Sequence, residues 1–476
     1  MKKLLSVLIL IAMVCTLTLS LASCNMGGRK PQKETYDVPE EGYDGSAVTI
    51  TFYHSMGAKL QGVLNTYIAE FHKLYPNITV VHYTMGDYDG VRDQINAGNQ
   101  PNLAYCYPDH VALYNVAKAV VPLDNFINCT VEVTDALGNT TTLGFTDEQL
   151  DDFVDGYYAE GSVFDEAGTM YTLPMSKSTE VLYYNKTFFE ENNLSVPTTW
   201  EEMKALCAQI LTIDPNCVPL GYDSEANWFI TMTEQYGSGY TSLDDDNHFL
   251  FDNDQNRAFV KEFNDWYQKG YITTEAIYGS YTSGLFTATE GLRCYMVIGS
   301  TGGASYQTPP TTTGSDGAKV SLFETGIAML PQVDASSPKV IFHGPSLCIF
   351  KDDNPQEVVA SWLFVKFLTS NVEFQAAFSM ASGYAPVIDS VQENSIYEGW
   401  LAKGNGKTNL QALAVKQAIA QNNAYFVSPA FNGSSVARDQ VGILLQDALV
   451  LKGDNIDDAI KKLFKDAIDE CEYQAG

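Results

Sequence analysis

The sequence predicts an α/β fold built from alternating strands and helices. Residues 47–53 alternate apolar and polar side chains and are rich in β-branched residues, which is typical of a strand. Residues 59–75 carry apolar side chains at helical spacing, and residues 78–83 form a second strand pattern. A strand, a helix and a strand of these lengths are typical of a βαβ unit in a parallel sheet.

The strand–helix alternation continues along the chain. Ligands of parallel sheets bind beyond the carboxyl ends of the strands, so we expect the loops at 54–56 and 86–88 to line a cleft. Thr198 or Thr199 is a plausible N-cap, because acidic residues follow it. Further predicted elements are strands at 181–185 and 324–331 and helices at 187–192, from 199, from 354–355 to 367–368, at 373–380 and at 454–471.

The amino terminus has the pattern of an export signal. Two lysines precede an uncharged apolar run from Leu4 to Ser20, and Leu21-Ala22-Ser23-Cys24 resembles the lipobox of bacterial lipoproteins. This resemblance implies a signal peptide at 1–23 and lipidation of Cys24. An uncleaved membrane-spanning helix is the alternative, but it needs no such motif at its outer end. Residues 24–46 predict a flexible tether to the membrane, since they are nearly devoid of apolar side chains.

The composition excludes one class of partner and favours another. The chain carries 58 acidic and 28 basic side chains, a net charge of −30, which would repel nucleic acids. The 28 tyrosines suit sugars and polyols, which present C–H faces and hydroxyl edges, although tyrosine also fills the half-wet surfaces of exported proteins. Seven cysteines follow Cys24 without a CxxC, so we expect mostly buried thiols; a bridge between Cys207 and Cys217 is the alternative.

The sequence contains no complete catalytic or metal-binding motif of the common kinds. The nearest approach to a nucleophile elbow, residues 344–348, lacks the final glycine, and the six histidines show no metal-ligand spacing. Residues 252–256 imitate a calcium loop, but Arg257 stands where glycine is needed, so they predict a helix N-cap. We therefore expect neither a metal nor a cofactor. A secreted glycoside or phosphodiester hydrolase is the alternative, since it needs only two suitably placed carboxylates. A surface adhesin or sensor module is a third class.

Four segments carry a resemblance to a known family. They are Thr51-Phe-Tyr-His-Ser-Met56, Ser178-Thr-Glu-Val-Leu-Tyr-Tyr-Asn-Lys186, His343-Gly-Pro-Ser-Leu347 and Ser382-Gly-Tyr-Ala-Pro-Val387. From about residue 48 onward the chain resembles family 1 extracellular solute-binding proteins, the group of maltose and glycerol-3-phosphate binders. The likeness is closer to the glycerol-3-phosphate type.

The resemblance implies a two-lobed fold of the periplasmic-binding-protein type (type II), with mixed sheets flanked by helices and a ligand cleft at the hinge. We expect lobe 1 at 47–155 and 324–375 and lobe 2 at 156–323 and 376–476. The implied protein is a lipid-anchored monomer outside the cytoplasm that binds a small polar solute, a sugar or a polyol phosphate. Its implied partners are the transmembrane subunits of an ABC permease and a cytoplasmic ATPase.

The family's pocket positions match eight residues of this chain. Aromatic rings would stack on the ligand, serine hydroxyls and a glycine N–H would form hydrogen bonds, and the arginine would pair with a phosphate, a carboxylate or several hydroxyls. The matched residues are Tyr88, Ser176, Trp228, Ser300, Ser305, Gly344, Tyr384 and Arg438.

Several of these residues have a purely structural alternative. Trp228 could instead be a core residue, Tyr384 could fix a hinge turn, and Arg438 could be an ordinary residue on the surface of a helix. His54 predicts a turn-stabilising side chain, and Asp109 a helix cap.

The chain also departs from the family pattern. In Tyr107-Pro108-Asp109 the carboxylate is displaced by one position, and residues 130–145 form an extra segment that predicts a small hairpin.

Overall fold

The computed structural model describes residues 32–244 and 247–475. The chain divides into two compact units, Met1–Glu34 and Thr35–Gly476, and every helix and strand given below belongs to the second. The predicted signal peptide and Cys24 lie outside the described residues. Within those residues, no helix is long and apolar enough to cross a membrane.

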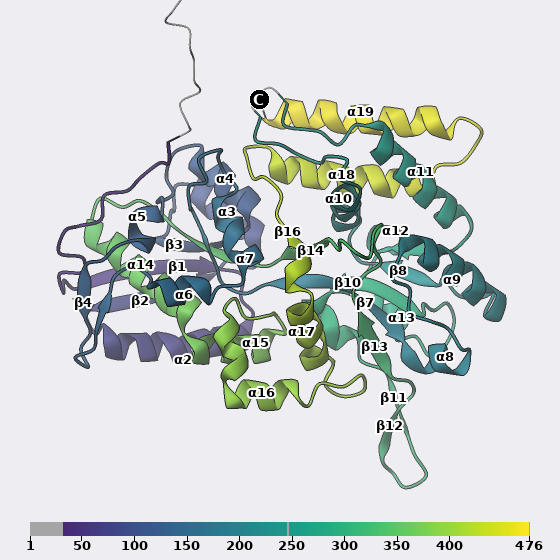
Figure 1. Cartoon of the computed structure of the whole chain (residues 1–476), viewed down its shortest axis with the longest axis horizontal. Coiled ribbons are helices and arrows are strands. Elements are labelled where there is room, and N and C mark those ends of the chain that lie inside the picture. Colours follow the sequence, from purple (N-terminus) through teal and green to yellow (C-terminus); the bar gives the residue numbers. More distant parts are fainter. Residues whose placement is uncertain (1–31, 245–246, 476) are drawn as a thin grey trace, which may run out of the picture. The chain divides into compact units, whose positions relative to one another are not determined.

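The first sheet has five strands in the order β2-β1-β3-β15-β6 (Figure 1). β1 pairs in parallel with β2 and β3, which confirms the predicted βαβ unit, while β15 runs antiparallel to β3 and β6. The strands are β1 (Val48–His54), β2 (Ile78–Thr84), β3 (Leu103–Cys106), β6 (Leu173–Pro174) and β15 (Ser346–Ile349).

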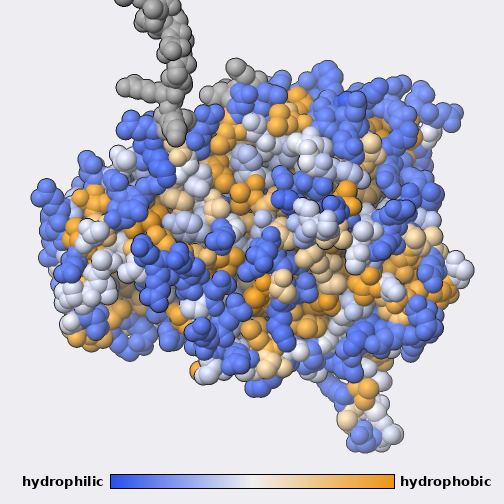
Figure 2. Space-filling model, viewed as in Figure 1, coloured by the Kyte–Doolittle hydropathy of each residue, from blue (hydrophilic) through white to orange (hydrophobic). Residues whose placement is uncertain are grey.

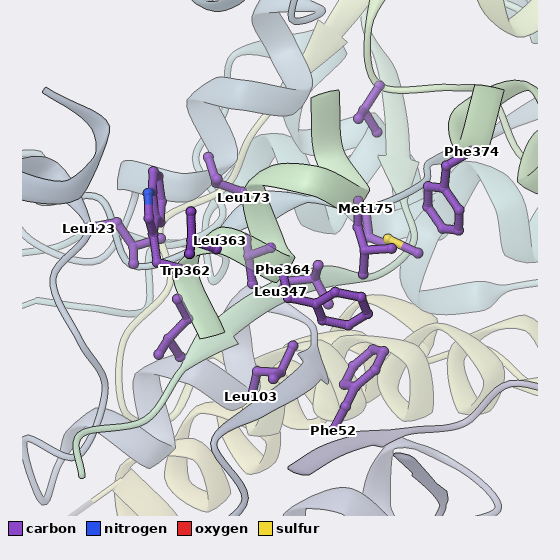
Figure 3. Packing of buried hydrophobic residues seen from close by; sticks show 14 of the residues in the cluster. Phe52, Leu103, Leu123, Leu173, Met175, Leu347, Trp362, Leu363, Phe364 and Phe374 are labelled. Atoms are coloured by element: carbon purple, nitrogen blue, oxygen red, sulfur yellow. The ribbon is translucent and has the colours of Figure 1, made fainter. Parts of the chain in front are cut away.

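A first core lies between this sheet and its helices. Phe52 of β1 packs against Phe364 of α14 (Pro355–Ser370), and Figure 3 shows Leu103 and Leu347 beside them. The predicted proline at the start of α14 is confirmed, and Gly383, with φ 79°, caps the end of α15 (Val372–Ser382) as expected. Other helices of this half are α2 (Ala58–Leu74), α3 (Tyr88–Asn96), α4 (Pro108–Asn115), α5 (Asp124–Ile127), α6 (Asp147–Asp151), α7 (Asp155–Ala159), η1 (Glu160–Ser162), η3 (Asp389–Glu393) and α16 (Ser395–Leu401).

The second sheet has seven strands. Its order is β16-β14-β7-β10-β8-β9, and β13 also pairs with β7. β7 is antiparallel to β10, β13 and β14, whereas β8 is parallel to β9 and β10. The strands are β7 (Ser178–Asn185), β8 (Leu220–Tyr222), β9 (Ile272–Thr274), β10 (Met296–Ser300), β13 (Thr325–Ala328), β14 (Val340–His343) and β16 (Tyr425–Phe426).

Helices enclose a second core around this sheet. Thr199 caps α9 (Trp200–Ile213) in a capping box with Glu202, as predicted, and Asn253 caps α11 (Asp254–Gln268) where the calcium-like sequence stands. α18 (Ser434–Val450) and α19 (Ile456–Ala475) run side by side (Figure 1). The remaining helices are α8 (Lys186–Glu191), α10 (Glu225–Tyr236), α12 (Glu275–Tyr278), α13 (Ser283–Phe286), η2 (Thr301–Gln307), α17 (Leu410–Ala420) and η4 (Asn422–Ala424).

The chain passes between the two sheets at residues 175–177 and again at 344–345. Lys177 also forms backbone hydrogen bonds in both directions with Ala385. The predicted lobe boundaries stay a prediction. Because β13 and β14 pair with β7, we propose that the return to the first lobe lies at 344–345.

Two small hairpins stand apart from the main sheets. β4 (Glu132–Thr134) and β5 (Thr140–Thr142) confirm the hairpin predicted in the extra segment. A second hairpin, β11 (Thr311–Thr313) and β12 (Lys319–Ser321), projects from the second sheet (Figure 1).

The surface and the cysteines agree with the composition. Hydrophilic residues cover much of the visible face, with apolar residues scattered among them (Figure 2). The seven cysteines from Cys106 to Cys471 are free thiols, and all except Cys129 are buried. The alternative bridge between Cys207 and Cys217 is therefore not formed.

Candidate functional site

A cleft of about 450 Å³ is lined by elements from both halves of the fold. The half with the five-stranded sheet contributes the starts of α3 and α4 and the residue Glu160. The other half contributes α10, β14, the segment around 426–429 and the start of α18. The cleft lies beside the passage at 344–345, since His343 lines it.

Arg438 projects into this cleft from the second turn of α18. The helix begins after Gly433, whose φ of 116° favours glycine, and a Cβ there would lie 2.8 Å from the Cβ of Ala475. This turn brings Ser434, Ser435 and Arg438 to the cleft wall. One guanidinium nitrogen, Nη2, donates a hydrogen bond to Oδ1 of Asn227 on α10.

Two buried polar atoms beside Arg438 have no hydrogen-bond partner among the described residues. They are the hydroxyl of Tyr240 and Nδ1 of His343, and both residues line the cleft. Burial, with the nearby Arg438 and Lys177, lowers the pKa of His343 to about 3, so its imidazole is neutral at pH 7. Buried polar groups normally form hydrogen bonds, so these two atoms are suited to bind a polar ligand.

The charges of the cleft are partly compensated. Arg92 pairs with Asp89 at 2.8 Å, and Glu160 pairs with the buried Lys177. Asp109 and Asp439 also line the cleft, and neither forms an ion pair within the described part of the chain. Arg438 therefore faces more carboxylate than cationic charge.

Of the eight predicted ligand contacts, Arg438 lines this cleft. Trp228 does not, because its side chain is fully buried in the second core. It stacks on Tyr222 with ring centroids 5.0 Å apart and packs against Phe263 at 4.0 Å. Its position on α10 is next to Asn227, which does reach the cleft.

Ser176 and Gly344 meet where the chain passes between the sheets. Gly344 has a φ of 125°, and a Cβ there would lie 2.5 Å from the carbonyl oxygen of Ser176. The hydroxyl of Ser176 is buried and has no hydrogen-bond partner among the described residues. These two residues form a close backbone contact beside the cleft.

Ser300 and Tyr384 lie together in a separate group. Ser300 caps η2 by accepting a hydrogen bond from the N–H of Gly302, and the Tyr384 ring packs against Gly302. A Cβ at Gly302 would overlap this ring, which explains the glycine. Ser305 is exposed in η2. The backbone of Tyr88 begins α3, but its side chain lies outside what the structure describes.

Two structural alternatives have different outcomes. The expectation for His54 is confirmed, because its Nδ1 accepts a hydrogen bond from the Met56 N–H at 3.1 Å. The expectation that Asp109 caps a helix is wrong. Tyr107 is the N-cap of α4, and Asp109 lies in the first turn with its side chain at the cleft.

Sequence reasoning missed several residues around Arg438. Glu180 lies within the family motif at 178–186, and Asn227 stands next to Trp228, so both were adjacent to a signal. His343 begins the family segment at 343–347, so it also lay within a signal. Tyr240 reaches the cleft from a loop outside the four segments, and no pattern in the sequence pointed to it.

The described residues contain no group of three or more histidine, cysteine or acidic side chains placed to hold a metal ion.

Comparison with known proteins gives consistent matches. The family described as bacterial extracellular solute-binding protein matches residues 66–404. The sn-glycerol-3-phosphate-binding periplasmic protein UgpB of Salmonella typhimurium (strain LT2) is 23% identical over 381 residues, which cover 76% of this chain and 79% of that protein. UgpB of Pectobacterium atrosepticum is 25% identical over 387 residues, which cover 76% of this chain and 78% of that protein.

Solved structures share the two-lobed fold. UgpB from Mycobacterium tuberculosis in complex with glycerophosphocholine has a TM-score of 0.66 at 17% identity, covering 90% of this chain and 100% of that one. The sugar-binding protein MalE from Xanthomonas citri has a TM-score of 0.67 at 18% identity, with 90% and 98% covered. The predicted fold class is confirmed.

Proposed function

Because the chain belongs to the family of bacterial extracellular solute-binding proteins, we propose that it captures a carbohydrate or a polyol phosphate and delivers it to the permease of an ABC importer. Members of this family are transport proteins that bind substrates and are not enzymes, so the hydrolase alternative is set aside. The observation that carries the proposal is the cleft in which Arg438 lies beside the buried Tyr240 hydroxyl and His343 Nδ1.

The charge of the cleft favours an uncharged, polyhydroxylated solute. Hydroxyl groups can donate to the carboxylates of Asp109 and Asp439 and accept from Arg438 at the same time. A phosphate dianion would be attracted by Arg438 but repelled by the carboxylates of Asp109 and Asp439. A carbohydrate therefore fits this lining better than a phosphate monoester does.

The eight pocket positions remain part of the proposal. Arg438 is supported by its place in the cleft, and Ser300 and Tyr384 by their mutual packing around Gly302. Trp228 would act only through the packing of α10.

A panel of ligands tests the solute class. Thermal shift and calorimetry would compare maltose and maltotriose with sn-glycerol 3-phosphate and glycerophosphocholine. We expect a sugar to raise the melting temperature, because ligand binding stabilises the folded state. A response to sn-glycerol 3-phosphate without any response to sugars would contradict the charge argument.

Arg438→Ala tests the site itself. We expect the affinity for the sugar that binds to fall about tenfold or more, since a charged hydrogen-bond donor is lost. Arg257→Ala is a matched control, because Arg257 carries the same charge on α11 and does not line the cleft. Equal affinities of wild type and Arg438→Ala would exclude Arg438 from the site.

We also propose that Cys24 is lipidated and anchors the protein to the outer face of the cell membrane. The support is the Leu-Ala-Ser-Cys motif after the apolar run. Cys24→Ala should release the protein from the membrane fraction, and incorporation of labelled palmitate should be lost. Retention of the variant on the membrane would overturn the anchor at Cys24.

A further inference from the structure

The carboxylate of Glu180 is buried in the second sheet and has only neutral hydrogen-bond donors. Glu180 lies on β7 and is 1% exposed. Its Oε2 accepts from the Tyr222 hydroxyl at 2.6 Å, and its Oε1 accepts from Nδ2 of Asn227 at 2.8 Å. Within residues 32–244 and 247–475 it forms no ion pair.

Asn227 connects this carboxylate to the cleft. An asparagine side chain has donors only on its nitrogen and accepts only through its oxygen. The nitrogen of Asn227 donates to Glu180, so its oxygen points away and accepts from Nη2 of Arg438. The orientation of the amide, and with it the hydrogen bond to Arg438, is therefore set by the carboxylate.

We propose that Glu180 is a positioning residue for ligand binding, which acts through Asn227 to hold the Arg438 guanidinium in its orientation toward the solute. The inference rests on the proposed function, in which Arg438 contacts the solute. Glu180 itself does not line the cleft. Its role is to fix a polar group that does.

The state of Glu180 depends on pH near neutrality. Burial raises the pKa of Glu180 to about 7, against the lowering effects of the Tyr222 and Asn227 hydrogen bonds and of Arg438. Asp223, which follows β8, raises it further.

Other elements pack against β7 near Glu180. The side-chain amide of Gln421, which follows α17, donates a hydrogen bond to the backbone carbonyl of Glu180. Ser300 of β10 lies opposite Glu180 in the antiparallel pairing of β10 with β7. Two titratable side chains lie at the passages between the sheets, Lys177 just before β7 and His343 at the end of β14. His343 is neutral and Lys177 pairs with Glu160, so neither compensates Glu180.

Protonation changes what Asn227 presents to Arg438. A protonated Glu180 can donate its O–H to the Asn227 oxygen, and the amide then turns its nitrogen toward Arg438. The N–H groups of Asn227 and Arg438 then face each other. Since neither can accept, the hydrogen bond that orients Arg438 is lost. Affinity should therefore be higher above pH 7 and lower below it.

Calorimetric titrations between pH 5.5 and 8.5 test the proposal, with maltotriose and glycerophosphocholine as probes. For the probe that binds wild type at pH 8, we expect the affinity to fall about fivefold by pH 6, the size of one hydrogen bond. Glu180→Gln should remove this pH dependence. Glu234→Gln is the control, because Glu234 is a half-buried carboxylate on the same helix as Asn227 and has no contact with Arg438. Parallel pH profiles for wild type and Glu180→Gln would overturn the proposal.

A ligand-free measurement separates this proposal from the proposed function. The side-chain amide resonance of Asn227, in protein labelled with ¹⁵N-asparagine, should titrate with a midpoint near pH 7 in wild type and stay constant in Glu180→Gln. If neither probe binds but the resonance titrates, the assumed solute class is wrong and the link from Glu180 to Asn227 is supported. A resonance that does not change between pH 6 and 8 would overturn the link.

Discussion

Two buried charged residues lie three positions apart, Lys177 just before β7 and Glu180 on it, and they differ in their partners. Lys177 is fully buried and donates to the Glu160 carboxylate, to the carbonyl of Gly344 at 3.0 Å and to the Ser346 hydroxyl at 2.9 Å. Glu180 accepts hydrogen bonds from neutral groups and, among the described residues, forms no ion pair. One charge is compensated and the other is not.

Burial therefore serves two purposes at neighbouring positions of the chain. The Lys177–Glu160 pair joins three segments that meet where the chain passes between the sheets, because Gly344 lies in the second passage and Ser346 follows it. Removing one partner of such a pair would leave an uncompensated buried charge, which is strongly destabilising. The uncompensated carboxylate of Glu180 can instead change its protonation near neutral pH.

The largest loss of stability is expected from removing a ring that packs beside Glu180 and helps to exclude water from it. Trp228 stacks on Tyr222, which donates to Glu180. Trp228→Ala should lower the free energy of unfolding by about 3–5 kcal/mol, measured by urea denaturation, since a large buried ring leaves a cavity. Tyr236→Ala on the same helix, at a residue that is 37% exposed, should cost clearly less. Equal losses would show that Trp228 is not a core residue.

Removing Lys177 tests the buried ion pair between Lys177 and Glu160. Lys177→Met leaves the Glu160 carboxylate buried without its cation and should cost about 3–4 kcal/mol of unfolding free energy. Replacing both residues, as Lys177→Met with Glu160→Gln, should restore part of the loss. A double variant less stable than the single one would contradict charge compensation as the reason for the pair.

The pH dependence of the unfolding free energy tests the buried Glu180 carboxylate, which has no ion-pair partner among the described residues. The pKa of Glu180 is about 7 in the folded protein and 4.5 ordinarily, so between these values the folded state binds the extra proton. Stability should therefore fall as pH rises from about 4.5 to 7, by roughly 3 kcal/mol. The advantage of Glu180→Gln over wild type in unfolding free energy should grow by this amount between pH 5 and 8. A difference that stays constant with pH would show that Glu180 keeps an ordinary pKa.

The smallest effect is expected for a partly exposed ion pair beyond the end of β7, at the first residue of α8. Lys186 contacts Glu324 at 2.8 Å, and the side chains are 39% and 31% exposed. Solvent screens such a pair, so Lys186→Ala should change the unfolding free energy by less than about 1 kcal/mol. A cost as large as that of Lys177→Met would mean that burial is not what separates the two ion pairs.

Much of the fold could be predicted because its signals are local. The strand and helix patterns at 47–83 correspond to β1, α2 and β2, and the N-caps at Thr199 and Asn253 follow from side chains that bond to their own helix starts. Asp109 shows the limit of such reasoning. A carboxylate in a first turn is compatible with capping, but Tyr107 takes the cap position and leaves Asp109 to the cleft.

The sequence by itself determined the α/β pattern and the family, because both depend on residue types at short spacing. The choice of Arg438 came from the resemblance to that family. Only the tertiary structure decided that Trp228 lies in the core while its neighbour Asn227 joins Glu180 to Arg438. The reason is that β7, α10 and α18 are far apart in sequence. Their side chains acquire burial and partners only when packing brings these elements together.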